Sequence, residues 1–298
     1  MVGFMNSGLP GPFGHLAEAF RKGLAEQGFE DGRNIAIEYR WAEGRYDRLP
    51  DLAQELVRRG ATAIAATGGG MSTRAAIAAT NTLPIVFAIG EDPVKFGFVA
   101  SLNRPGGNVT GVTQLTADLG TKRLSLLREL LPEMRRLALL LNPDFPDSAR
   151  QHSELEEASR SARLELVVQN ARTEADFEPA IKALRGARPD ALLVGADPYF
   201  NSRRARLVSL VEQARLPAIW EFREFAQAGG LISYGTDLAD AYRHVGIYVG
   251  RVLKGERPAD LPVLQAAKFE MVINLRTAKV LGLNVPATLL ARADEVLE

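Results

Sequence analysis

The sequence predicts an α/β protein with two lobes, each built on a doubly wound parallel sheet. Short apolar runs alternate with longer stretches of helical periodicity along all 298 residues, and such alternation gives parallel strands joined by right-handed crossovers. A chain of this length exceeds one small hydrophobic core and suits two lobes of average domain size. In addition, the second half of the chain repeats the order of features in the first half.

Ten apolar runs have the length and composition of buried strands. Two of the helices between them start with the pattern of a capping box, Ser148 with Gln151 and Thr173 with Asp176. The predicted strands are Val2–Met5, Ile35–Arg40, Ala61–Thr67, Pro84–Ala88, Val109–Thr113, Leu137–Leu141, Leu164–Gln169, Ala191–Gly195, Pro217–Trp220 and Leu231–Tyr234.

The repeat between the halves is clearest at the ends of these strands. The first strand ends in Phe-Met-Asn-Ser-Gly-Leu-Pro at 4–10, and the strand that opens the second half ends in Leu-Leu-Asn-Pro-Asp-Phe-Pro at 140–146. Each half also has a later strand that ends in a small-residue loop, at 67–70 and at 195–198. Ligands of open α/β sheets bind beyond the carboxyl ends of the strands. Two facing sheets would therefore make one ligand cleft.

Composition argues against several function classes. The 36 Lys and Arg residues equal the 36 Asp and Glu residues, and no run of five basic residues occurs, so we expect no nucleic-acid partner. The chain has no cysteine, which excludes disulfides, thiolate metal sites and thiol nucleophiles. No apolar run reaches the roughly 18–20 residues that a membrane-spanning helix needs.

No catalytic or cofactor motif can be assembled from the sequence. The three histidines, His15, His152 and His244, lie far apart and show no metal-ligand spacing. The glycines within 8–14 are spaced one residue too widely for a dinucleotide loop, and two prolines remove amides that such a loop needs. Residues 70–74 lack the closing glycine of a nucleophile elbow. We therefore expect a binding protein rather than an enzyme, with no cofactor and no metal.

Several segments together carry a family resemblance. Glu-Asp-Pro-Val at 91–94 and Leu-Asn-Arg-Pro-Gly-Gly-Asn-Val-Thr-Gly-Val at 102–112 strongly resemble the tryptophan-type ABC transporter substrate-binding proteins, long labelled an uncharacterised periplasmic component. One difference is the triple glycine at 68–70, where the family often has a threonine-rich loop. Further matching segments follow in order over essentially the whole chain: 28–35, 84–87, 130–132, 141–143, 233–237, 253–258 and 273–294.

The resemblance implies the type I periplasmic-binding-protein fold, with two lobes joined by three hinge crossovers. On this basis the chain leaves the first lobe near Thr113–Leu115, returns after residues 234–235 and crosses a last time around Pro262–Phe269. The expected lobes are 1–114 plus 236–263, and 115–235 plus 264–298, with the ligand cleft between them.

The resemblance also implies a function, the solute-binding subunit of a bacterial ABC importer. Such a subunit captures a small ligand by lobe closure and delivers it to an ABC permease in the membrane. Members of the family include binders of aromatic amino acids. We expect a monomer in the periplasm, with a signal or lipoprotein leader that precedes the residues of this sequence.

Topology places the expected ligand contacts in the loops at the carboxyl ends of the strands. Helix starts near Ser7, Ser72 and Ser148 expose amides and a positive dipole end, which suit a ligand carboxylate, although each serine is equally expected to be a simple N-cap. The first lobe offers Asn6, Ser7, Gly8, Thr67, Gly68, Gly69, Ser72, Glu91 and Asp92. The second lobe offers Asn142, Asp144, Ser148, Asp197, Tyr199, Trp220, Glu221 and Asp237.

Three aspartates are candidates to hold a ligand ammonium group, Asp92, Asp197 and Asp237. The first two precede prolines, where an Asx-turn is the structural alternative, and the third is equally expected to cap a helix. Glu221 is expected either as a ligand contact or as a solvated loop acid.

Two aromatic residues, Tyr199 and Trp220, are expected to stack on an aromatic ligand, a contact worth about 0.5–1.5 kcal/mol per ring pair. The expected ligand is therefore a small carboxylate-bearing molecule, such as an aromatic or branched amino acid. Two alternatives stay open. A DNA-binding segment encoded upstream would favour the effector core of a transcription regulator, and a buried nucleophile–base pair would favour an α/β enzyme with an unrecognised site.

Overall fold

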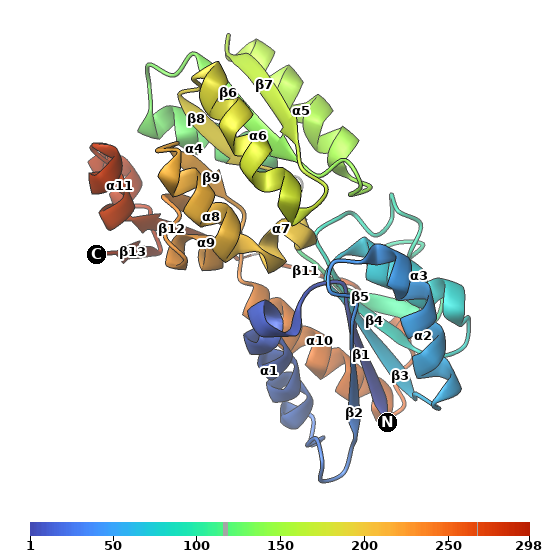
Figure 1. Cartoon of the computed structure of the whole chain (residues 1–298). Helices are drawn as coiled ribbons and strands as arrows, with labels where there is room; N and C mark the ends of the chain where they lie inside the picture. Colours follow the sequence, from blue (N-terminus) through green and yellow to red (C-terminus); the bar gives the residue numbers. More distant parts are fainter. Residues whose placement is uncertain (116–118, 267) are drawn as a thin grey trace. The chain divides into compact units, whose positions relative to one another are not determined.

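The computed structural model describes residues 1–115, 119–266 and 268–298, which form two compact units (Figure 1). Unit 1 contains the described residues of Met1–Leu115 and Leu238–Ala267, and unit 2 those of Thr116–Asp237 and Lys268–Glu298. The chain therefore passes between the units three times, as expected for the predicted fold. Ala267, which falls in the predicted third crossing, and residues 116–118 lie outside the described residues.

Unit 1 contains a six-stranded sheet in the order β11-β5-β4-β3-β1-β2, and all of its pairings are parallel. Four of the strands are buried along their whole length, as is typical of a parallel sheet covered on both faces. The elements are β1 (Val2–Asn6), α1 (Pro10–Glu26), β2 (Ile37–Trp41), η1 (Tyr46–Arg48), α2 (Leu49–Arg58), β3 (Ala63–Thr67), α3 (Gly70–Ala79), β4 (Ile85–Ile89), β5 (Val109–Thr113), α10 (Leu238–Leu253), η3 (Pro258–Asp260) and β11 (Leu264–Gln265).

The short strand β11 differs from the lobe limits expected from the sequence. Those limits put residue 264 and everything after it in the second lobe. In the structure, Leu264 and Gln265 pair with Val112 and Thr113 of β5 and so extend the sheet of unit 1. A strand of two residues carries no apolar pattern that a sequence could reveal.

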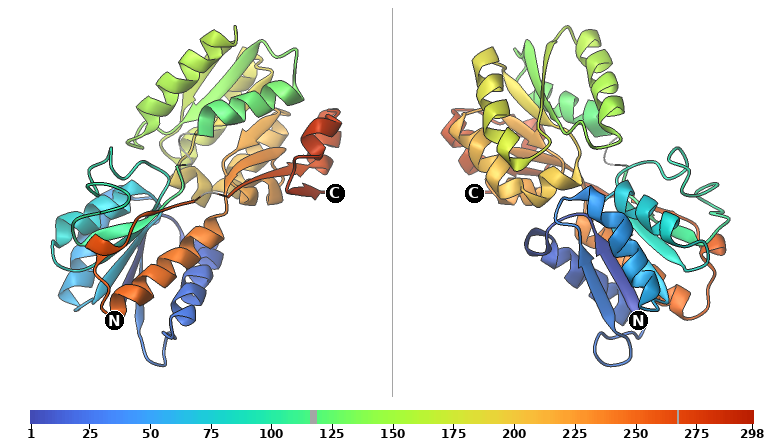
Figure 2. Two further views of the ribbon diagram at one scale, coloured as in Figure 1. Left: turned by 180° about the vertical axis from the view of Figure 1, so that it is seen from behind. Right: turned by 45° about the vertical axis from the view of Figure 1, so that its right-hand side comes forward.

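Helices α1 and α10 pack side by side on one face of this sheet, while α2 and α3 cover the other (Figures 1 and 2). Glycines allow the close approach of α1 and α10. A Cβ atom on Gly23 would lie 1.9 Å from the carbonyl oxygen of Arg243, and one on Gly246 would lie 2.1 Å from that of Phe20. The two helix backbones are therefore in direct contact, and only a residue without a side chain fits there.

Unit 2 contains a seven-stranded sheet in the order β13-β12-β10-β9-β8-β6-β7. All of its pairings are parallel except that of β10 with β12, which is antiparallel and places Phe269 opposite Thr236, so β12 and β13 run opposite to the other five strands. When the chain enters unit 2 for the second time, it does so beside the carboxyl end of β10, and β12 therefore runs back along β10. The elements are α4 (Gly120–Leu130), β6 (Arg136–Leu141), α5 (Ser148–Ser161), β7 (Glu165–Asn170), α6 (Glu174–Ala187), β8 (Ala191–Val194), α7 (Pro198–Ser202), α8 (Arg204–Gln213), β9 (Ala218–Trp220), α9 (Arg223–Gln227), β10 (Ile232–Thr236), β12 (Phe269–Asn274), α11 (Leu275–Leu281), α12 (Ala287–Leu290) and β13 (Glu295–Leu297).

Helices cover both faces of this sheet, with α4 and α5 on one face and α6, α8 and α9 on the other (Figure 2). The predicted capping box of Thr173 and Asp176 begins α6 and is confirmed. The box predicted at the start of α5 is wrong. That helix begins after Asp147. The side-chain amide of Gln151 instead accepts from the backbone N–H of Ala196 at 2.8 Å and donates to the carbonyl oxygen of Ala196 at 3.0 Å.

Candidate functional site

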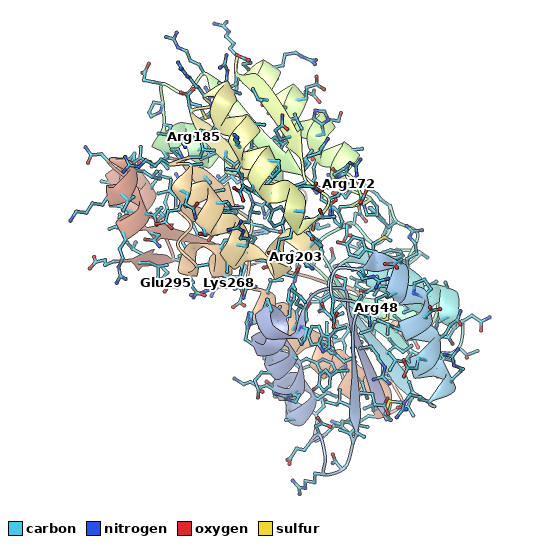
Figure 3. The ribbon with its side chains drawn as sticks, in the orientation of Figure 1. Arg48, Arg172, Arg185, Arg203, Lys268 and Glu295 are labelled. Carbon is cyan, nitrogen blue, oxygen red and sulfur yellow. The ribbon has the colours of Figure 1, made fainter. Side chains whose placement is uncertain are left out.

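In unit 1, the expected contact residues lie in three loops that follow β1, β3 and β4. These strands are neighbours in the sheet, so their carboxyl ends meet at one edge and bring the loops together. We call residues 6–8, 67–73 and Glu91, with Gln114 after β5, the unit 1 loop cluster. Figure 3 shows Arg48 at this same end of unit 1.

Asn6 holds the first two loops together. Its side chain is fully buried, and its amide nitrogen donates to the hydroxyl oxygens of Thr67 and Tyr242, both at 2.9 Å. Its amide oxygen accepts from the backbone N–H of Gly8 at 2.7 Å. The hydroxyl of Ser7 donates to the carbonyl of Gly68, so this serine ties two loops together and does not cap α1, which begins without a side-chain cap.

The glycine loop after β3 depends on glycine at two positions. Gly68 and Gly69 have φ angles of 78° and 98°, which residues other than glycine rarely adopt. A Cβ atom on Gly68 would also lie 2.7 Å from the hydroxyl of Ser7. The loop then delivers the chain into α3, where the backbone N–H of Gly70 donates to a carboxylate oxygen of Glu91 at 3.0 Å.

The hydrogen bond between Gly70 and Glu91 changes the role expected for the start of α3. Glu91 is 2% exposed and is further held by the hydroxyl of Thr113, which donates to its carbonyl oxygen at 2.8 Å. The amide of Gly70, which was expected to be available for a ligand carboxylate, is therefore already bonded to a protein carboxylate. A negative group at a helix start is stabilised by the helix dipole, and Glu91 takes this position in the structure.

Three buried polar groups in this cluster have no hydrogen-bond partner within the described part of the chain. They are the hydroxyls of Ser72 and Thr73, both fully buried in the first turn of α3, and the amide nitrogen of Gln114, which is 4% exposed. An unpaired buried polar group costs about 1–3 kcal/mol. These groups are therefore the part of unit 1 best suited to receive hydrogen bonds from a ligand or to donate them.

Asp92 has a local structural role. One of its carboxylate oxygens accepts from the backbone N–H groups of Val94 and Lys95, at 2.9 and 3.2 Å. This geometry is the Asx-turn expected before a proline. The structure therefore favours the structural interpretation of this residue over ammonium binding.

In unit 2, the expected residues follow β6, β8, β9 and β10. Asn142 accepts from the backbone N–H of Asp144 at 3.0 Å, and Asp144 forms an ion pair with Arg172 at 3.2 Å. Figure 3 shows Arg172 and Arg203 at the carboxyl ends of these strands and Arg185 at the opposite end of the unit. We call Asn142, Asp144, Ser148, Asp197, Tyr199, Glu221 and Asp237 the unit 2 loop cluster.

Asp197 and Tyr199 form the turn after β8. A carboxylate oxygen of Asp197 accepts from the backbone N–H groups of Tyr199 and Phe200 and so caps α7. The guanidinium of Arg203 lies 3.8 Å from the centre of the Tyr199 ring, and the rings of Tyr199 and Phe177 form a T-shaped pair. Burial raises the pKa of Tyr199, and the charge of Arg203 opposes that shift. The ring remains partly exposed at the end of the strands.

Trp220 does not take the role expected from the sequence. It is fully buried and stacks on Phe225, with ring centres 4.8 Å apart. A Cβ atom on Gly230 would lie 2.6 Å from its ring nitrogen, so both the backbone and another ring enclose it. The side chain faces the core between the sheet and its helices, and no face is left for a ligand to stack on.

Asp237 lies beside a buried carboxyl that sequence reasoning did not select. Glu270, 6% exposed, pairs with Arg223 at 2.9 Å. Burial raises the pKa of Glu270, the negative charge of Asp237 adds to the rise, and Arg223 opposes it.

We expect the Tm of Glu270→Gln, measured relative to that of the parent protein, to rise as pH increases. A carboxyl whose pKa is higher in the folded state stabilises the protein below its unfolded pKa, and that contribution is lost as pH rises through the folded value. Arg223 keeps a second partner in Glu295. The difference in Tm between variant and parent should therefore grow by roughly 2 °C or more from about pH 4 to about pH 8. A constant difference across this range would show that Glu270 titrates normally.

Within residues 1–115, 119–266 and 268–298, no three His, Asp or Glu side chains gather as a metal ion would need. Across the same residues, every helix is too short or too polar to span a bilayer.

Comparison with known proteins gives one family. The family model described as ABC transporter substrate binding protein matches residues 14–297. The tyrosine-binding protein of Clostridioides difficile is 28% identical over 267 residues, which are 89% of this chain and 76% of the relative.

Two solved structures are similar over nearly the whole chain. An ABC domain from Streptococcus pneumonia in complex with L-Trp is 25% identical, with a TM-score of 0.89 and 99% of both chains covered. A conserved domain protein from Vibrio cholerae is 26% identical, with a TM-score of 0.91 and coverage of 99% of this chain and 98% of that one.

Proposed function

The chain belongs to the ABC transporter substrate-binding protein family, and on this premise we propose that it captures an aromatic amino acid. As a member of this family it is a solute-binding protein of an ABC transport system and not an enzyme. The observation that carries the proposed ligand is the full-length similarity to a structure that holds L-Trp, together with similarity to a tyrosine-binding protein.

The unit 1 loop cluster supports this proposal. We assign the ligand carboxylate to the first turn of α3, where the hydroxyls of Ser72 and Thr73 lack partners among the described residues. Each hydroxyl can donate to a carboxylate oxygen, and such charge-assisted bonds are the stronger kind. The backbone amide of Gly70 is not part of this assignment, because Glu91 already occupies it.

The unit 2 loop cluster supports an aromatic ligand with an amino group. Tyr199 is its partly exposed ring, and the cation of Arg203 holds that ring in place. Glu221 is 7% exposed at the end of β9, and we assign the ligand ammonium group to it. Asp92 and Asp197 are weaker choices because both accept backbone hydrogen bonds in turns.

Three further parts of the proposal concern partners, mechanism and location. The partner that receives the ligand is an ABC permease, the binding protein acts as a monomer without nucleic acid, and it works in the periplasm. Ligand capture is accompanied by lobe closure, which a ligand-dependent fall in the radius of gyration in small-angle scattering would test. Size-exclusion chromatography with light scattering tests the monomer.

The direct test of the ligand is calorimetry and thermal unfolding with L-tryptophan, L-tyrosine, L-leucine and D-ribose. The protein should first be unfolded and refolded, so that any ligand carried from the cells is removed. We expect the aromatic amino acids to stabilise the protein by about 2.7 kcal/mol at 100 times Kd. No change with either aromatic amino acid at millimolar concentration would contradict the proposal.

We expect Ser72→Ala to weaken binding of the aromatic amino acid about 10- to 100-fold, because it removes a hydrogen bond to a charged group. The unliganded protein should be as stable as the parent or slightly more stable, since an unpaired buried hydroxyl is removed.

Ser159→Ala is the matched control. Ser159 is equally buried and its hydroxyl also has no partner in the described chain, but it lies in the last part of α5, away from the loops. This variant should leave Kd unchanged. An equal loss of affinity in both variants, or none in Ser72→Ala, would remove Ser72 from the ligand contacts.

A further inference from the structure

Gln114 is a buried amide that sequence reasoning did not select. It is the first residue after β5, at the end of the sheet where the unit 1 loop cluster gathers, and it is 4% exposed. Its side-chain nitrogen has no hydrogen-bond partner in the part of the chain that the structure describes. Buried polar groups are normally hydrogen-bonded, so the position of this amide requires an explanation.

The backbone at Gln114 is held by the strands on both sides of β5. Its own N–H donates to the carbonyl oxygen of Ile89, at the end of β4, at 2.9 Å. On the other side, the backbone N–H of Ala266, just after β11, donates to the carbonyl oxygen of Thr113 at 2.9 Å. The side chain of Gln114 therefore starts from a fixed point, and a ligand that it binds would meet a preorganised donor.

The hydroxyls of Ser72 and Thr73, which also lack partners among the described residues, lie at the same end of the sheet. They belong to α3, which follows β3, and β4 separates β3 from β5 in the sheet. Glu91, after β4, joins the two places, because its side chain accepts from the amide of Gly70 and its carbonyl oxygen accepts from the hydroxyl of Thr113. Three potential donors without a described partner therefore gather in one loop cluster, although they come from two distant segments.

We propose that Gln114 is a specificity-determining residue, whose amide donates a third hydrogen bond to the ligand carboxylate and so selects a free carboxylate over an uncharged group. A carboxylate accepts at about four positions, and the hydroxyls of Ser72 and Thr73 fill only two of them. Glu91 places an acidic group in the same loops, and like charge opposes a second carboxylate there, so a further donor has a large effect. The inference rests on the proposed function, because it names another residue of the same carboxylate site.

The experiment compares L-tryptophan with L-tryptophanol, in which a hydroxymethyl group replaces the carboxylate while the amino group and the ring are kept. Their Kd values are measured by calorimetry for the parent, Gln114→Met and Gln114→Asn. We expect Gln114→Met to weaken L-tryptophan binding about 10- to 100-fold and to leave L-tryptophanol within about fivefold of the parent. Gln114→Asn keeps the amide but shortens its reach by one carbon, so it should also lower the preference for L-tryptophan, and it provides the measurement if Gln114→Met does not fold.

Two other glutamines provide matched controls. Gln265 is exposed and lies opposite Thr113 in β11, so Gln265→Met should leave both Kd values unchanged. Gln151 is 5% exposed, but its amide is bonded to both backbone groups of Ala196. Gln151→Met should therefore lower the Tm of the unliganded protein, whereas Gln114→Met should keep or raise it, because no protein hydrogen bond is lost.

Three results would overturn the inference. They are an equal loss of affinity for both ligands in the Gln114 variants, a parental preference for L-tryptophan in those variants, and a parent protein that binds L-tryptophanol as tightly as L-tryptophan. Failure of the proposed function would look different, because the parent protein itself would then bind no aromatic amino acid.

Discussion

Replacing Gly68 by alanine is expected to weaken binding of the aromatic amino acid by at least about 10-fold, which corresponds to about 1.4 kcal/mol. The φ angle of 78° opposes any side chain, and a new Cβ atom would lie 2.7 Å from the Ser7 hydroxyl and 2.8 Å from the amide oxygen of Asn6. The Ser7 hydroxyl joins the first two loops of the unit 1 loop cluster, and the Asn6 oxygen accepts from the backbone N–H of Gly8 within the first loop. The loop must therefore move, and the first turn of α3 with it. Calorimetry gives the Kd, and thermal unfolding gives the stability of the unliganded protein.

Gly60→Ala separates the effect of the φ angle from the effect of the contacts that a new Cβ atom would make. Gly60 has the same φ angle of 78°, but no atom lies within 4 Å of its expected Cβ position. The stability of this variant should fall by only about 1–2 kcal/mol, which is the cost of alanine in a left-handed conformation, and its Kd should equal that of the parent. If Gly60→Ala and Gly68→Ala have the same effect on both quantities, backbone strain alone accounts for the result and the loop contacts do not matter for binding.

Gly246→Val is expected to destabilise unit 1 by about 3 kcal/mol or more, because overpacking of this kind forces the backbone to shift. The first carbon of the new side chain would lie 2.1 Å from the carbonyl oxygen of Phe20 and 2.8 Å from the backbone nitrogen of Leu24. Neither backbone atom can rotate away, so α1 and α10 must separate. Circular dichroism should show a fall of roughly 10 °C in the first unfolding transition.

Gly14→Ala is the control for the intrinsic effect of glycine in a helix. Gly14 lies in α1, is exposed, and has no atom within 4 Å of its expected Cβ position. Alanine should stabilise the helix there by about 0.5–1 kcal/mol. A Gly246→Val protein as stable as the parent would mean that the two helices are not in backbone contact.

The strands were largely predictable because buried parallel strands are continuous apolar runs. All ten predicted strands are present, and segments such as Leu137–Leu141 match the observed β6 closely. The strand β12 escaped prediction because Glu270, which pairs with Arg223, interrupts its apolar pattern. The two-residue β11 and three-residue β13 are too short to carry any pattern.

The candidate site was predictable only in part. Strand ends place residues such as Ser7 and Glu91 at one edge of a sheet, but they do not show which groups are already bonded to the protein. Both faces of a parallel sheet are buried, so alternation along β9 could not reveal that Trp220 points into the core. Arg123 of α4 is 1% exposed, and it was overlooked because a charged residue in a helix normally indicates an exposed face.

The contact between α1 and α10 also affects how this protein can fold during its synthesis. Helix α10 and strand β11 complete unit 1, but the ribosome makes them only after residues 116–237. At about 5–20 residues per second, the first part of unit 1 therefore waits for several seconds or more. During that time the glycine surface of α1 and the outer edge of β5 lack the segments that cover them. A nascent chain at this stage offers an open strand edge, which is a template for pairing with another chain.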